Sequence, residues 1–107
     1  MDEPDLPFLP YSCQSIDEDD IAAVVAVLRS DYLTTGPAVP AFEEALAAEV
    51  GSCFAVAVAN GTAALHAACF AAGVGPGDEV IVPAVTFAAT ANCARYLDAE
   101  PIFADVD

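Results

Sequence analysis

The sequence predicts an α/β fold in which two leading helices precede a βαβαβ unit with a parallel sheet. Short apolar runs of strand length recur in the second half of the chain, at residues 53–59, 79–82 and 102–106. Segments with helical character, bounded by glycine or proline, separate these runs. Strands that alternate with helices in this way join through crossovers into a parallel sheet covered by helices.

The first helix is predicted to begin at a capping box and to end near Ser30. Ser15 and Glu18 have the spacing at which a serine side chain accepts a backbone N–H while the glutamate reaches back. Apolar residues then follow at helical spacing and form one stripe: Ile21, Val24, Val25 and Leu28. Residues 1–14, which start acidic and proline-rich, are expected to be a lead-in segment before a domain at residues 15–107.

A loop is predicted at residues 31–37 and a second helix at residues 40–50. Phe42, Leu46 and Val50 share one side of that helix. Gly51 follows as the expected C-terminal cap, because glycine adopts the left-handed conformation of such caps without steric cost.

The strands of the second half are connected by two further predicted helices. Residues 62–72 are rich in alanine and stop at Gly73, and a Gly-Pro-Gly-Asp turn at residues 75–78 leads into the next strand. Residues 87–97 predict the second of these helices. The first strand, at residues 53–59, is continuously apolar and is therefore expected to be buried on both faces.

Charge and composition exclude several function classes. The formal net charge is −15, with Arg29 and Arg95 as the two basic residues. A charge of that sign repels phosphate backbones and anionic lipids, so no nucleic-acid or membrane partner is expected. The apolar fraction of 57% exceeds the roughly 45–50% usual for soluble domains, which indicates a piece that packs against further polypeptide.

The cysteines and the long uncharged stretch have ordinary explanations. No spacing typical of a zinc or redox pair relates Cys13, Cys53, Cys69 and Cys93, so we expect reduced structural thiols in a cytoplasmic protein. Residues 50–77 carry no acidic or basic side chain apart from one histidine. This stretch is long enough for a membrane span. Glycine interruptions and the excess of alanine favour a buried strand and helix instead.

A candidate phosphate site lies where the first strand gives way to a helix. Residues 60–62 read Asn-Gly-Thr. A helix start offers unpaired N–H groups and partial positive charge, Gly61 permits close backbone approach, and the Thr62 hydroxyl adds a donor. The alternative is a plain turn, since Asn-Gly also favours hairpins, although the helical pattern after Thr62 argues against a hairpin. Neither a Rossmann nor a P-loop fingerprint is present.

Several motifs in order resemble the DegT/DnrJ/StrS family of sugar aminotransferases, which use pyridoxal phosphate (PLP). They read YLTTGPAVPAFE at residues 32–43, AVANGTAALH at 57–66, GPGDEVIVP at 75–83, TFAATAN at 86–92 and PIFADVD at 101–107. PYSCQSIDEDD at residues 10–20 further resembles the branch that makes UDP-4-amino-4,6-dideoxy-N-acetyl-β-L-altrosamine, a pseudaminic acid precursor. The resemblance implies the opening part of the large domain of a fold-type-I PLP enzyme.

The same resemblance implies a set of site residues. Gly61, Thr62 and the Ala63 backbone N–H would hold the PLP phosphate. Phe87 would stack on the pyridine ring, a role that suits a flat aromatic, whereas without the family it would be taken as ordinary core. The sugar-nucleotide pocket would be lined by Tyr11, Asp31, Tyr32, Leu33 and Thr34.

Two further features are expected to have no catalytic role. His66 falls inside the helix after residues 60–62, among alanines, and is expected to be a hydrogen-bonded packing residue. Asp105 and Asp107 end a predicted strand and are assigned no metal.

The chain contains no lysine, whereas the enzymes that it resembles hold PLP as a Schiff base on a lysine amine. We therefore expect a truncated piece that is inactive alone. Its intact relatives would pass an amine from glutamate to a 4-keto nucleotide sugar and would be homodimers. The alternatives are a non-catalytic remnant or interaction module of the same fold, and a different α/β nucleotide binder.

Overall fold

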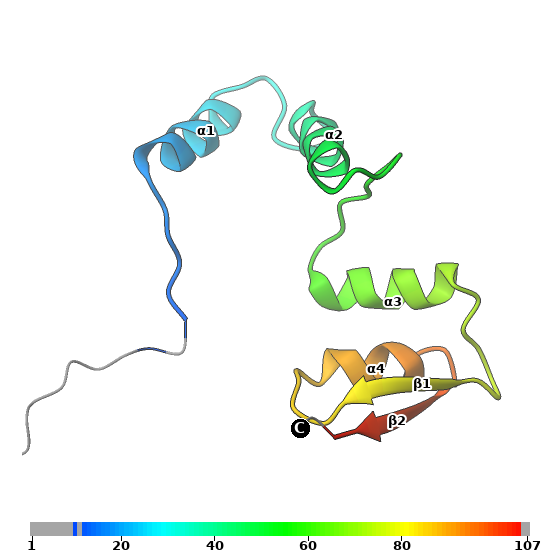
Figure 1. Cartoon of the computed structure of the whole chain (residues 1–107). Coiled ribbons are helices and arrows are strands. Elements are labelled where there is room, and N and C mark those ends of the chain that lie inside the picture. The colour runs from blue at the N-terminus through cyan, green and yellow to red at the C-terminus, as the bar shows by residue number, and fades with distance from the viewer. Residues whose placement is uncertain (1–9, 11, 106–107) are drawn as a thin grey trace, which may run out of the picture. The chain divides into compact units, whose positions relative to one another are not determined.

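The computed structural model describes residue 10 and residues 12–105 (Figure 1). Within this part the order of elements is α1 (Glu18–Leu28), α2 (Ala38–Val50), α3 (Gly61–Ala71), β1 (Glu79–Pro83), α4 (Ala89–Arg95) and β2 (Glu100–Ala104). The chain divides into two compact units, the first up to Ala41 and the second from Phe42 onward. None of the described helices combines the length and apolar character needed to cross a bilayer.

Helix α1 begins at a capping box, but two residues later than predicted. Asp17 is the N-cap, and its Oδ1 accepts from the backbone N–H groups of Asp19 and Asp20, each at 3.0 Å. Asp20 Oδ2 accepts from the Asp17 N–H at 3.1 Å. The Ser15–Glu18 box is therefore wrong, because a charged carboxylate at Asp17 satisfies two N–H groups beside the positive end of the helix dipole. The helix ends as predicted, with the Ser30 hydroxyl donating to the Val27 carbonyl at 2.8 Å.

Helix α2 starts two residues before the predicted boundary and ends where expected. Pro40 lies in its first turn, where a missing N–H costs nothing. Gly51 has φ +66°, and the Ser52 N–H bonds to the Ala47 carbonyl at 2.9 Å, which confirms the glycine cap. Phe42, Leu46 and Val50 share one side of α2 and are exposed, whereas Ala47 is buried.

Residues 53–59 form no strand in the described structure. The side chains alternate: Ala55 and Ala57 are half-buried, while Phe54 is 87% exposed and Val56 and Val58 are exposed as well. The expectation of a strand buried on both faces is thus not met. An apolar run specifies a strand only when a neighbouring strand completes the hydrogen-bond ladder, and none lies beside these residues in the described part of the chain.

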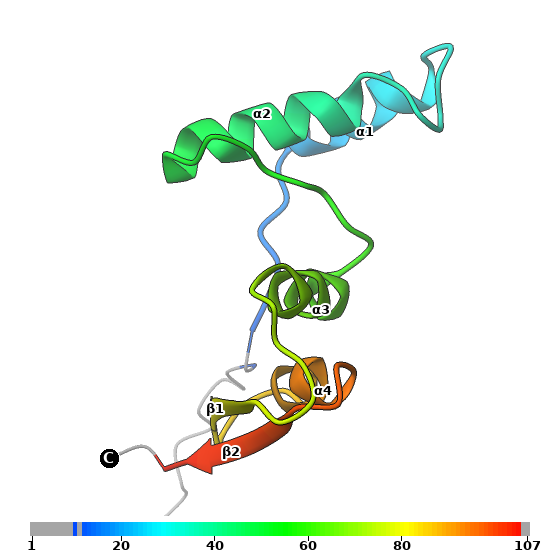
Figure 2. The ribbon, with the colours of Figure 1, turned by 90° about the vertical axis from the view of Figure 1, so that its right-hand side faces the viewer.

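The α/β character and the parallel sheet are confirmed in the second unit. Strands β1 and β2 pair in parallel, with Glu79 opposite Glu100 and Ile81 opposite Ile102. Helix α4 packs on both strands and α3 packs on α4, so that the layers follow one another in both views (Figures 1 and 2). The core is made of small residues around one valine: Val82, Ala89, Cys93, Ala94 and Ala99.

In this unit α3 ends where the sequence predicts, whereas β2 begins earlier than predicted. Gly73, with φ +79°, ends α3 as predicted. After α4, Asp98 takes the left-handed conformation at φ +58°, and the Ala99 N–H bonds to the Ala94 carbonyl at 3.1 Å. The chain therefore turns at once into β2, which begins at Glu100 rather than at the predicted residue 102. The predicted end of that strand lies outside the described residues.

The exposed apolar side chains predict self-association of the 107-residue chain as salt rises. The described sheet has two strands and so leaves one edge of each unpaired, a template for association. Ile81, Phe87 and Phe103 add exposed apolar surface. The net charge of −15 opposes association at low salt, but screening limits its reach to about 8 Å at physiological ionic strength.

Sedimentation at two salt concentrations, with binding of a dye to apolar surface and a thermal melt, tests this expectation. Larger species and stronger dye binding at high salt are expected, together with a broad melt. A monomer at both salt concentrations with a sharp, cooperative melt would contradict it.

Candidate functional site

The residues predicted to hold phosphate lie at the first turn of α3. Asn60 is the N-cap with extended backbone angles, and its Oδ1 accepts from the Ala63 N–H at 2.9 Å. Gly61 and Thr62 are the first helical residues, so the Asn-Gly pair opens a helix and the hairpin alternative is excluded. The Ala63 N–H, which the resemblance predicts to bind the cofactor phosphate, therefore already donates to the Asn60 carboxamide.

Two backbone donors stay available at this helix start. In the described part of the chain nothing accepts from the N–H of Gly61 or of Thr62. A Cβ built on Gly61 would meet no atom within 4 Å, so the surface there is open to an incoming group. These N–H groups and the helix dipole suit an anion, and the half-buried Thr62 brings a hydroxyl beside them. The residues therefore fit the phosphate group of a cofactor.

Phe87 lies in the connection between β1 and α4. It precedes the helix by two residues rather than starting it, and its carbonyl accepts from the Thr90 N–H at 3.0 Å. Its side chain is 78% exposed, so it is not part of the core of the described chain. The hydroxyls of Thr86 and Thr90 lie 2.9 Å apart and brace the turn around it. An exposed aromatic on a braced turn can stack on a flat ligand.

The topology brings these two places to the same end of the unit. Helices α3 and α4 both begin at the end of the sheet where β1 and β2 finish (Figure 1). The first turn of α3 and the Phe87 connection therefore share the carboxyl edge of the parallel sheet. Ligands of open α/β sheets bind at this edge.

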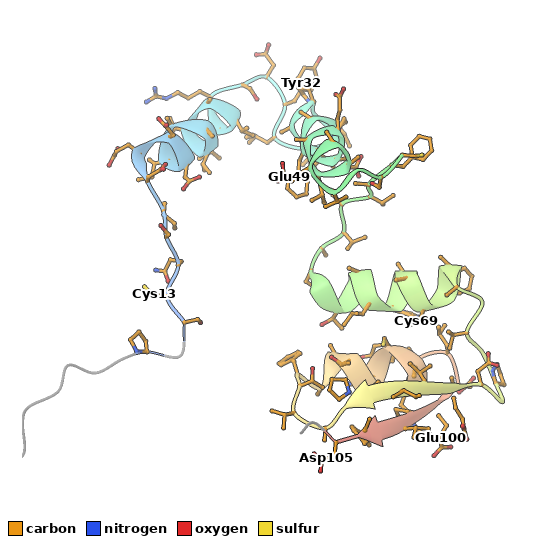
Figure 3. The ribbon with its side chains drawn as sticks, in the orientation of Figure 1. Cys13, Tyr32, Glu49, Cys69, Glu100 and Asp105 are labelled. Carbon is orange, nitrogen blue, oxygen red and sulfur yellow. The ribbon has the colours of Figure 1, made fainter. Side chains whose placement is uncertain are left out.

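The predicted sugar-pocket residues belong to the first unit, except that Tyr11 lies outside the described residues. Tyr32 is exposed in the loop before α2 (Figure 3). Its loop neighbours Asp31, Leu33 and Thr34 are exposed as well. The loop has its own hydrogen bonds, since the Ser30 hydroxyl donates to the Tyr32 carbonyl at 3.0 Å. A Cβ at Gly36 would lie 2.7 Å from Tyr32 Cβ, so glycine is needed for this close approach.

Tyr32 also borders a hollow that the sequence did not indicate. Its volume is about 350 Å³, and it is lined by Ala26, Val27, Ser30, Tyr32, Pro37, Ala38 and Ala41. The lining comes from the end of α1, the loop and the start of α2. An apolar hollow beside an exposed tyrosine can take a flat or apolar part of a ligand.

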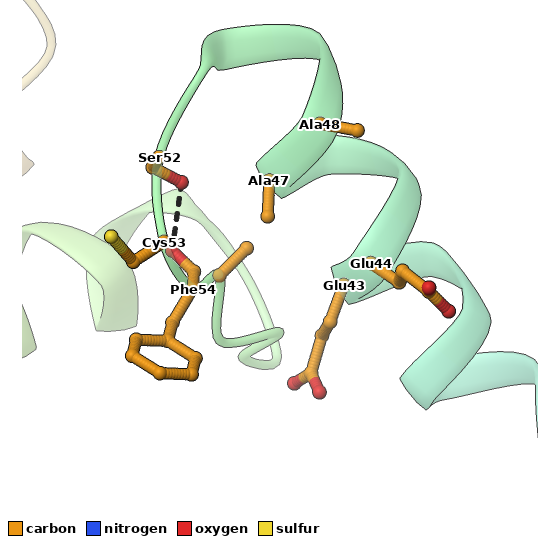
Figure 4. Close-up of a pocket in the computed structure, with 8 residues that line it drawn as sticks. Glu43, Glu44, Ala47, Ala48, Ser52, Cys53 and Phe54 are labelled. Atoms are coloured by element: carbon orange, nitrogen blue, oxygen red, sulfur yellow. Dashed lines mark hydrogen bonds between the residues drawn. The ribbon is translucent and has the colours of Figure 1, made fainter.

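Glu43 is a polar contact that sequence reasoning missed. Its Oε1 accepts from the Ala57 N–H at 2.7 Å, which joins α2 to the segment before α3. The half-buried Glu43 and its exposed neighbour Glu44 border an open cavity of about 450 Å³ (Figure 4), lined by Glu43, Glu44, Ala47, Ala48, Ser52, Cys53, Phe54 and Ala55. No sequence signal pointed to this contact, because the burial of Ala47, which lies four residues further along the same helix face, is seen only in the structure.

Other reactive side chains have packing roles. The His66 ring contacts the Tyr96 ring, with centroids 5.2 Å apart and planes tilted by 57°. His66 is exposed, so the hydrogen-bonded packing role predicted for it is supported only by this ring contact. Partial burial raises the pKa of the Cys69 thiol, and the hydrogen bond and charge of the Cys93 thiol act in the same direction. Cys69 therefore stays a protonated, weakly nucleophilic thiol. No cluster of metal-ligating side chains occurs within residues 10 and 12–105.

Comparison with known proteins gives consistent matches. The model of the DegT/DnrJ/EryC1/StrS aminotransferase family matches residues 14–107. The chain is 45% identical over 100 residues to the UDP-4-amino-4-deoxy-L-arabinose--oxoglutarate aminotransferase of Shewanella sediminis. It is 49% identical over 100 residues to the spore coat polysaccharide biosynthesis protein SpsC of Bacillus subtilis. Each alignment covers 94% of this chain and 26% of the relative, so the chain spans about a quarter of these relatives.

A solved structure extends the similarity to three dimensions. A sugar aminotransferase of Streptococcus pneumoniae in its PLP form matches with a TM-score of 0.81 at 37% identity. The match covers 92% of this chain and 25% of that chain. The same protein has also been solved in its pyridoxamine phosphate (PMP) form, with the same TM-score.

Proposed function

Because the chain belongs to the DegT/DnrJ/EryC1/StrS aminotransferase family, we propose that its residues form part of a PLP-dependent aminotransferase acting on a nucleotide sugar. The observation that carries this proposal is the carboxyl edge of the sheet. There the open N–H groups of Gly61 and Thr62 lie at the same edge as the exposed Phe87. A relative solved in PLP and PMP forms supports the choice of cofactor.

The chain's own residues would bind and orient the cofactor. The N–H groups of Gly61 and Thr62 and the Thr62 hydroxyl would hold its phosphate, and Phe87 would fix the plane of its ring. Ala63 would contribute only by sharing an N–H that now bonds to Asn60. PLP, when bound, supplies the electron sink for amino transfer. We place these residues in the large domain of a fold-type-I enzyme, residues 15–107 after a lead-in at residues 1–14.

The finer parts of the proposal rest on the motif at residues 10–20 and on the family. We propose a 4-keto nucleotide sugar of pseudaminic acid synthesis as the acceptor and glutamate as the amino donor. Tyr11, Asp31, Tyr32, Leu33 and Thr34 would line the sugar site, and the enzyme would be a cytoplasmic homodimer. A relative named as an oxoglutarate aminotransferase for an amino-arabinose nucleotide supports this substrate class.

A second candidate is a non-catalytic interaction module of the same fold. Its motivation is that these 107 residues contain no lysine, whereas the family chemistry needs a lysine amine. The two candidates differ in whether residues 14–107 can serve a working aminotransferase.

A chimeric enzyme distinguishes the two candidate functions. Residues 14–107 of this chain would replace the matching stretch of the Shewanella sediminis aminotransferase, which supplies the rest of the enzyme. We expect the chimera to bind PLP, seen by its absorption spectrum, and to transfer an amine between the nucleotide sugar and oxoglutarate. A chimera that folds with the melting behaviour of the relative but binds no PLP would favour the interaction module.

A further inference from the structure

We propose that Glu43 is a positioning residue, which holds the segment before α3 against α2 and thereby places the first turn of α3 for an anion. The proposal rests on the proposed function, since the anion is the cofactor phosphate. Glu43 would not touch the ligand. It would act through the backbone at Ala57, three residues before the N-cap Asn60.

The contact itself has the features of a strong hydrogen bond. Glu43 Oε1 and the Ala57 N atom are 2.7 Å apart, the short distance expected when the acceptor is ionised. Both residues are half-buried, which limits competition from water. The bond joins residues 14 apart in the sequence, so it fixes a tertiary relation rather than a local turn.

The segment depends on this contact because it has no sheet ladder. Residues 53–59 pair with no strand of the described structure, and their backbone groups need other partners. At its start the segment is fixed by the cap at Gly51 and by the Ser52 hydroxyl, which donates to the Phe54 carbonyl at 2.9 Å. Between that point and the N-cap Asn60, the bond from Ala57 to Glu43 is the side-chain anchor. Losing it would free the chain that leads into α3.

Glu44 provides a matched control. It is the next residue of α2, carries the same charge and borders the same cavity (Figure 4), but it is exposed. The Ala57 N–H bonds to Glu43 instead. Replacing either glutamate by alanine removes one negative charge from the chain. A difference between the two variants therefore reports the hydrogen bond and not the change in charge.

The experiment uses the full 107-residue chain at low ionic strength, labelled with ¹⁵N-glycine. The six glycines give six amide signals, of which Gly61 reports the first turn of α3 and Gly51 and Gly73 report two helix caps. Inorganic phosphate is titrated against matched sodium chloride. Gly61→Ala, whose added methyl meets no atom within 4 Å, assigns the signal without disturbing the fold.

We expect the Gly61 signal of the parent and of Glu44→Ala to saturate with phosphate at the same concentration. Glu43→Ala should need roughly tenfold more phosphate, as expected when a hydrogen bond to a charged group is lost. Glu43→Gln keeps an acceptor oxygen and should fall between them. In a second sample labelled with ¹⁵N-alanine, hydrogen exchange at Ala57 should speed up in Glu43→Ala and not in Glu44→Ala.

Equal phosphate affinity in Glu43→Ala and Glu44→Ala would overturn the role of Glu43 while leaving the proposed function intact. A parent Gly61 signal that ignores phosphate would overturn the proposed function and this role with it. If Glu43→Ala disturbs the Gly51 and Gly73 signals, the fold has changed and Glu43→Gln decides: an affinity equal to that of Glu44→Ala then counts against the proposal.

Discussion

Thr62→Val is expected to weaken PLP binding by roughly ten- to hundredfold in the chimera that carries residues 14–107. Valine has the shape of threonine but lacks the hydroxyl that we propose faces the cofactor phosphate at the start of α3. Hydrogen bonds to charged groups contribute about 1.5–3 kcal/mol, and each 1.4 kcal/mol is a factor of ten in the dissociation constant. The backbone N–H groups of Gly61 and Thr62 are unchanged, so binding should be weakened and not abolished.

The measurement is the PLP dissociation constant of the chimera and two variants. Thr62→Ser is the matched control, because it keeps the hydroxyl and loses only a methyl group. We expect Thr62→Ser to bind nearly as well as the parent chimera. A dissociation constant that is the same in the valine and serine variants would remove the Thr62 side chain from the phosphate site.

Local backbone rules explain what could be predicted from the sequence. Gly51 and Gly73 end α2 and α3 as expected, because their left-handed conformation favours glycine whatever surrounds the helix. The start of α3 was also predictable, since an asparagine cap followed by alanines specifies it within a few residues. The parallel pairing of β1 and β2 follows from the strand–helix–strand pattern.

Two kinds of feature were not predictable: those for which the sequence offers competing local alternatives, and those that depend on contacts between distant residues. The capping box forms at Asp17 and not at Ser15, because both residues have a suitable acidic side chain three positions later and spacing alone does not distinguish them. The apolar run at residues 53–59 predicted a strand, but a strand also requires a partner. Glu43 went unnoticed because nothing near it in the sequence points to Ala57. Without the family resemblance, the sequence favours a core position for Phe87, yet its side chain is exposed.

Because the sequence contains no lysine, we expect that PLP cannot be attached covalently to a side chain of this chain. A polypeptide of these 107 residues, mixed with PLP and reduced with borohydride, is expected to carry no cofactor on any side chain. Such an adduct forms when an unprotonated amine condenses with the aldehyde of PLP and loses water, and borohydride then reduces the new bond. The side chain that supplies this amine in PLP enzymes is lysine, and the guanidinium groups of Arg29 and Arg95 stay protonated. The same polypeptide should show no amino transfer to a keto sugar.

Peptide mapping by mass spectrometry reads out the result, and the chimera treated in parallel is the positive control. The N-terminal amine of Met1 reacts with any aldehyde and is blocked by acetylation before the experiment. A reduced adduct on the chimera but not on the 107 residues would locate the reactive amine in the part supplied by the relative. A side-chain adduct on the 107-residue chain, accompanied by turnover of a keto sugar, would contradict the division proposed above. In that proposal, these residues would hold and orient the cofactor, and the reactive amine would come from a lysine that is not among them.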